Sequence, residues 1–196
     1  MRKIVSVMAL LVLLLLIIVG AGSLTINTVK CVESGTSVKG IISTNTTWTL
    51  ANSPYVLTGP VLVNRSVVLT IEPGVIVNFT RYFIQVDGVL NARGNETHPI
   101  RFIGGYWENV NHASLLFTEA SVPWNEATGS GSIIDHAIIN LFESIKLQGS
   151  SPRISNSLIS GGVADALWVD SGSPLIINNT IVNNRVAGIA ISGGPS

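Results

Sequence analysis

The sequence predicts an all-β protein, a right-handed parallel β-helix (a solenoid) of about 22-residue coils that is preceded by a signal peptide. Three observations predict the parallel coil: a 22-residue repeat near the C-terminus, apolar residues alternating by two over residues 46–196, and no sustained helical period after residue 23. Apolar segments this short, separated by Gly, Ser, Asn and Pro, cannot bury a face alone. Stacked coil upon coil, they enclose one continuous interior.

The first segment, residues 1–22, predicts export. Arg2 and Lys3 precede an apolar run from Ile4 to Val19, and small residues follow, as in a secretory signal peptide. The run is shorter than the roughly 20 residues of a spanning helix. An uncleaved N-terminal anchor is the alternative. We therefore expect a secreted or cell-surface protein that meets the membrane only through this segment, if it is retained.

Residues 23–45 are expected to form a leader and an N-terminal cap, and residues 46–196 the β-helix. Cys31 is the only cysteine, so the fold must form without internal disulfides, and we interpret Cys31 as a free thiol. The formal net charge is zero and 11% of residues are charged. Nucleic acid is therefore not expected as a partner, because phosphate binding needs a basic stripe.

The repeat is carried by two columns of aliphatic residues spaced by 22 positions. These columns are Ile145, Leu167 and Ile189, and Leu147, Val169 and Ile191. Period-two alternation predicts that both columns point inward, while Lys146, Trp168 and Asp170 point outward. Asn156 and Asn178 align at a turn, where stacked asparagine side chains can hydrogen-bond along the axis.

The N-terminal half alternates in the same way with a looser period, and turn residues such as Pro73-Gly74 separate its segments. The pattern breaks between Gly104 and Gly131. We expect one long excursion from the coil there, carrying Trp107, His112 and Trp124.

Several segments also resemble a known superfamily. Residues 69–79, 86–94 and 99–102 resemble the opening coils of secreted right-handed parallel β-helix repeat proteins, and the Ser-Pro-x-Ile-x-Asn repeats at 151–156 and 173–178 resemble their later coils. That superfamily includes pectate-lyase-like enzymes, carbohydrate-binding proteins and a copper-binding accessory family. The resemblance implies a right-handed coil, in agreement with the general hand of parallel crossovers. The matching residues are structural, so no activity follows from them.

No catalytic residues are expected. Glycoside hydrolysis needs two carboxylates on a shared face, and the outward columns offer one. Asp135-His136 is similar to a dipeptide of some pectate lyases, but it aligns with the turn asparagines, which favours a structural role. The histidines are scattered, at 98, 112 and 136, so no metal or cofactor is expected.

Trp168 is the leading candidate for sugar binding, because an outward indole can stack on a sugar ring. Lys146 would lie one coil away and Asp170 two residues along. Alternatively, Trp168 packs against the excursion around Trp107 and Trp124. Candidate N-glycosylation sites in Asn-x-Ser/Thr sequons are Asn45, Asn64, Asn78, Asn95 and Asn178.

The function expected from the sequence is that of an exported, non-catalytic module, either adhesive or binding extracellular polysaccharide or cell-surface glycan. The alternative is a polysaccharide lyase or glycoside hydrolase of the pectate-lyase-like superfamily with its catalytic coils outside this segment. The last residues, 193–196, fall where earlier coils turn into a new strand. We expect a helix truncated at its C-terminus, the alternative being a natural stop covered by a partner or a second copy.

Overall fold

The computed structural model describes residues 35–105, 114–140 and 143–193. Residues 33–196 form one compact unit, and the description below concerns its described residues. The predicted signal peptide and Cys31 lie outside the described residues. Within the described ranges, no helix has the length and apolar character needed to cross a membrane.

The described residues of this unit form eighteen short strands and one 3-10 turn, Leu50–Asn52. The strands are β1 (Thr36–Ile42), β2 (Thr46–Trp48), β3 (Tyr55–Val63), β4 (Val68–Ile71), β5 (Ile76–Thr80), β6 (Ile84–Val86), β7 (Val89–Arg93), β8 (Ile100–Gly104), β9 (Leu115–Phe117), β10 (Ile133–Asp135), β11 (Ala137–Asn140), β12 (Ile145–Leu147), β13 (Arg153–Ser155), β14 (Leu158–Ser160), β15 (Leu167–Val169), β16 (Leu175–Ile177), β17 (Thr180–Val182) and β18 (Ile189–Ile191).

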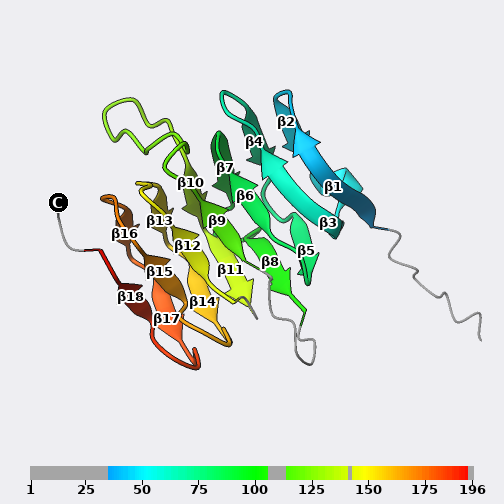
Figure 1. The fold of residues 1–196 in the computed structure, drawn as a ribbon. Helices are drawn as coiled ribbons and strands as arrows, with labels where there is room; N and C mark the ends of the chain where they lie inside the picture. Colours follow the sequence, from blue (N-terminus) through cyan, green and yellow to red (C-terminus); the bar gives the residue numbers. More distant parts are fainter. Residues whose placement is uncertain (1–34, 106–113, 141–142, 194–196) are drawn as a thin grey trace, which may run out of the picture. The chain divides into compact units, whose positions relative to one another are not determined.

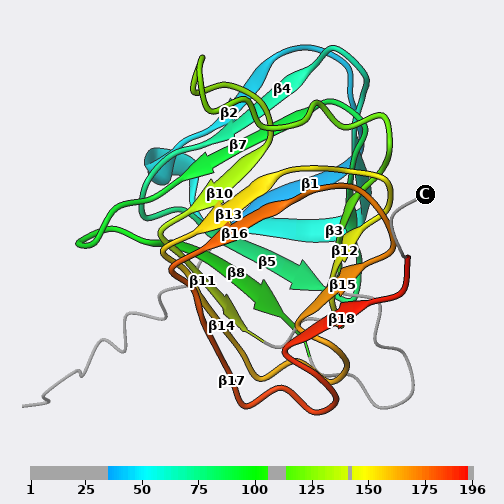
Figure 2. The same cartoon turned by 90° about the vertical axis from the view of Figure 1, so that its left-hand side faces the viewer.

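The strands form a parallel β-solenoid with three faces. Face A is the six-stranded sheet β16-β13-β10-β7-β4-β2. The 12-stranded sheet bends at the long strand β3 into face B (β5, β8, β11, β14, β17) and face C (β6, β9, β12, β15, β18). Every strand pairing is parallel, and each coil runs through A, B and C in turn (Figures 1 and 2). The all-β, parallel β-solenoid prediction is confirmed.

Alternation by two places one side chain in every pair inside. On β5, for example, Val77 and Phe79 are fully buried while Ile76 and Asn78 are half-buried on the outside. Phe79 packs edge-on against Phe102 of the next coil, with ring centroids 6.0 Å apart. One continuous apolar interior therefore runs through the coils, and it fixes which side chains remain outside to form a site.

The predicted inward columns are in register. Leu167 pairs with Ile145 on one side and with Ile189 on the other. Ile145 and Leu167 are fully buried, but Ile189 is 42% exposed and Ile191 72% exposed. Both belong to β18, which pairs with β15 and ends the sheet path among the described strands.

The predicted single excursion between Gly104 and Gly131 is wrong in one respect. Strand β9 lies in the middle of that range and pairs in parallel with β6 and β12. A strand of the coil therefore lies inside the range that was expected to leave it. Trp107 and His112 lie outside the described residues.

Candidate functional site

Face C carries a column of outward side chains that begins well before the predicted residues. Gln85 of β6, Leu116 of β9, Lys146 of β12 and Trp168 of β15 are consecutive partners in the register of this face. Each is half-buried, with one side against its neighbours and the other open. Because adjacent strands lie about 4.8 Å apart, the column presents amide, aliphatic, ammonium and indole groups in a continuous row.

A cavity of about 440 Å³ opens on this column. It is lined by Phe83, Gln85, Ser114, Leu116, Glu143, Lys146 and Gln148. Lys146 Nζ lies 3.4 Å from Glu143 Oε1, which orients the ammonium group at the cavity edge. Small-molecule sites in general combine apolar surface with a few fixed polar groups.

A second outward row, two residues along each strand, adds carboxylates. Asp87 accepts hydrogen bonds from Gln85 Nε2 (2.9 Å) and from Thr118 Oγ1 (2.8 Å). Asp170 accepts one from Ser192 Oγ at 3.1 Å. The structure thus brings Lys146, Trp168 and Asp170 to one face, as predicted.

Trp124 does not cover Trp168. Its ring lies on face A, with the guanidinium carbons of Arg93 (β7) and Arg153 (β13) 5.1 and 5.8 Å from the ring centroid. Arg153 also pairs with Glu126 at 2.7 Å, which fixes the loop between β9 and β10 to face A. The expected contact between Trp168 and Trp124 is therefore wrong, while Trp107, the other residue of that alternative, lies outside the described residues.

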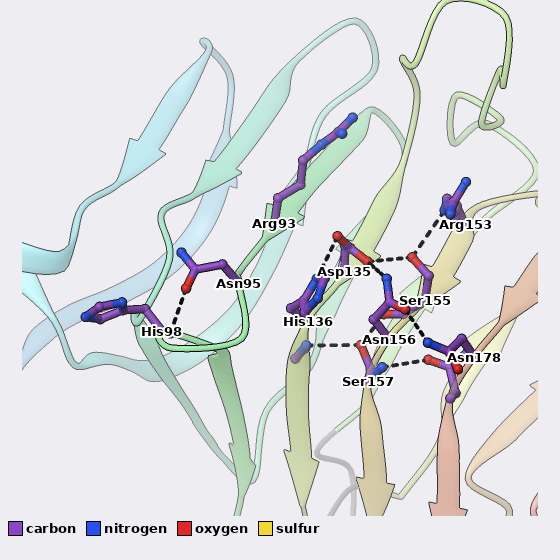
Figure 3. A network of polar contacts seen from close by, with 12 residues as sticks. Arg93, Asn95, His98, Asp135, His136, Arg153, Ser155, Asn156, Ser157 and Asn178 are labelled. Atoms are coloured by element: carbon purple, nitrogen blue, oxygen red, sulfur yellow. Dashed lines mark hydrogen bonds and ion pairs between the residues drawn. The ribbon is translucent and has the colours of Figure 1, made fainter.

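A second polar cluster lies at the turns that join face A to face B (Figure 3). Asp135 Oδ2 bonds His136 Nδ1 at 2.9 Å, and Asp135 Oδ1 accepts hydrogen bonds from Ser155 Oγ (2.7 Å) and Asn156 Nδ2 (2.8 Å). Asn178 Nδ2 in turn donates to Asn156 Oδ1 at 2.7 Å. The predicted asparagine ladder is confirmed, and Asp135 ends it.

The ionised state of Asp135 is stabilised by these bonds. Burial raises the pKa of Asp135, but hydrogen bonds from Ser155, His136 and Asn156 outweigh burial and bring the pKa below its ordinary value of 3.8. The carboxylate therefore stays charged at neutral pH and holds the His136 ring in place.

A cavity of about 590 Å³ lies beside this cluster. Its lining residues are Glu96, His136, Asn156, Ser157, Leu158, Asn178 and Thr180. Among the described residues, no group of three or more His, Cys, Asp and Glu side chains is placed to hold a metal ion.

The five predicted glycosylation sites differ in their surroundings. Asn45, Asn64 and Asn95 are exposed, and their side-chain oxygens accept backbone hydrogen bonds from Val68, Arg65 and Thr97 respectively. Asn78 is half-buried on β5. The Asn178 amide nitrogen is engaged in the ladder.

Sequence reasoning did not identify Gln85, Leu116 or Glu96 as site residues. Gln85 and Leu116 belong to the Lys146 column only because β6, β9 and β12 stack. Their separations are irregular: 31 residues from Ile84 to Leu115 (115 − 84) and 30 from Leu115 to Ile145 (145 − 115). A search at a fixed 22-residue spacing cannot find such partners.

Comparisons of this chain with protein-family models, with curated proteins and with solved structures find no match.

Proposed function

We propose that this protein is an exported β-solenoid that binds a glycan, an extracellular polysaccharide or a cell-surface chain, along face C. The observation that carries the proposal is the in-register row from Gln85 through Leu116 and Lys146 to Trp168, in which the first three residues line an open cavity. The Trp168 indole can stack on the C–H face of a sugar, and the Lys146 ammonium and Gln85 amide of the same row can hydrogen-bond sugar hydroxyls.

The charge pattern supports a neutral or weakly charged ligand. Lys146 is paired with Glu143, while Asp87 and Asp170 accept hydrogen bonds from neutral donors, so these groups are one cation and three carboxylates. A strongly anionic polymer would need a row of unpaired cations. These groups on the described part of face C include more carboxylates than cations, which opposes such a polymer.

Two further proposals accompany this one. The apolar segment over residues 1–22 supports export to the cell surface or medium. The sequence resemblance, together with the parallel coil of about 22 residues, supports a place in the pectate-lyase-like superfamily.

Binding of neutral hexasaccharides, such as cellohexaose, xylohexaose and mannohexaose, by isothermal titration tests the proposal. For the sugar that binds, Trp168→Ala should weaken the affinity about 10-fold or more, because truncating a Trp at the centre of a binding surface costs roughly 2 kcal/mol, whereas Trp168→Phe should retain much of the affinity.

The matched control is Ile138→Ala, an outward residue of β11 on face B. It should leave the affinity unchanged. If Trp168→Ala and Ile138→Ala bind alike, or if none of the sugars binds, the assignment of face C as the binding surface is wrong.

A further inference from the structure

His136 occupies the turn position at which the next two coils carry the asparagines of the ladder. The corresponding turn residues of the next two coils are Asn156 and Asn178. All three adopt left-handed backbone, with φ of 48°, 50° and 54°, a conformation that asparagine tolerates better than most residues. Asparagine would satisfy this turn, so the ladder itself does not require an imidazole at residue 136.

The bond to Asp135 determines the chemistry of the ring. Nδ1 faces the Asp135 carboxylate at 2.9 Å, so in the neutral imidazole Nδ1 carries the proton and Nε2 keeps its lone pair. Among the described residues, Nε2 has no hydrogen-bond partner, and His136 lines the 590 Å³ cavity. Asp135 is itself fixed by Ser155 and Asn156 (Figure 3).

We infer that Asp135 and His136 form a general-base dyad that activates water to hydrolyse small neutral esters in this cavity. His136 Nε2 takes a proton from water, and the water oxygen forms a bond to the ester carbonyl carbon. The bond from that carbon to the alcohol oxygen then breaks. His136 returns the proton to the leaving alcohol, so a carboxylic acid and an alcohol are released. Asp135 is a positioning residue, which holds the tautomer and stabilises the transient imidazolium.

The lining of the cavity selects the class of ester. The Glu96 carboxylate lies in the same cavity and opposes anionic substrates such as phosphate esters or uronates. Leu158 offers apolar surface for a short acyl group, and the Thr180 hydroxyl can donate to the substrate oxygen. The substrate class is therefore an uncharged ester with a small acyl group. This inference is independent of sugar binding on face C.

The ladder supplies a matched variant. His136→Asn places at this turn the residue that the next two coils use there, so the fold should be preserved while Nε2 is lost. With 4-nitrophenyl acetate as the probe, kcat/KM should fall about 100-fold, the usual range of general-base catalysis. Asp135→Asn should lower kcat at least about 10-fold with KM unchanged, because the wrong tautomer is then favoured.

His98→Asn controls for the ordinary reactivity of a surface imidazole. His98 is exposed, and its Nδ1 bonds the Thr97 hydroxyl rather than a carboxylate. The His98→Asn variant should hydrolyse 4-nitrophenyl acetate at the full rate of the parent protein. The inference is overturned if the protein hydrolyses the ester no faster than buffer, if a folded His136→Asn keeps its rate, or if His98→Asn loses as much. Equal, His136-dependent hydrolysis of 4-nitrophenyl phosphate would overturn the substrate class.

Discussion

Truncating one inward residue tests how the solenoid is held together. Leu167 is fully buried in the interior, between Ile145 and Ile189 of the adjacent coils. Leu167→Ala removes about three buried carbon groups, worth roughly 2 kcal/mol of transfer free energy, and leaves a cavity that adds about 1 kcal/mol or more. We expect the free energy of unfolding to fall by about 3 kcal/mol.

The matched control is Leu62→Ala, the same substitution on the outside of β3. Leu62 is half-buried and pairs with Gln85, so it keeps contact with solvent in the folded state. We expect a loss of about 1 kcal/mol or less. Urea unfolding followed by circular dichroism measures both values. Equal losses for Leu167→Ala and Leu62→Ala would refute the inward assignment of Leu167, as would a Leu167→Asp variant as stable as the parent.

Two further predictions concern the ladder turns and their charge. The stabilising contribution of Asp135, whose pKa is lowered in the folded state, should be present above its unfolded pKa of about 4 and be lost as pH falls through the folded value. The difference in unfolding free energy between the parent and Asp135→Asn should therefore shrink below about pH 4, and a difference that grows on acidification would contradict it. In a glycosylating host, a glycan on exposed Asn64 or Asn95 should leave the thermal midpoint unchanged, whereas one on Asn178 should lower it by breaking its bond to Asn156. Mass spectrometry and calorimetry of single-site variants measure this, and equal midpoints would count against the ladder as a source of stability.

The regular coils were predictable from the sequence because buried apolar residues recur in them at a fixed spacing of 22 positions. Leu147 and Val169 occupy equivalent positions 22 residues apart, and alternation is enough to turn both inward. Strand β9 was not predicted because Leu115–Phe117 offers only three residues of alternation inside an irregular stretch. Its pairing with β6 and β12 depends on loop lengths that no period reveals.

The two candidate sites were predictable to different degrees. Trp168 and Lys146 could be placed on one face because they share a column of the regular repeat. Asp135-His136 could be aligned with the turn asparagines, but not recognised as a dyad. The bond between two neighbouring side chains depends on the left-handed backbone at His136 and on Ser155 and Asn156 holding the carboxylate.

The indole resonances of Trp168 and Trp124 provide the most direct test of face C as a glycan-binding surface. The two rings lie on different faces, and Trp124 is held between Arg93 and Arg153. In a ¹H–¹⁵N spectrum, titration with the hexasaccharide that binds should shift the Trp168 indole signal in a saturable way and leave that of Trp124 in place. A saturable shift at Trp124 with none at Trp168, or no shift at either with any of the hexasaccharides, would contradict glycan binding on face C.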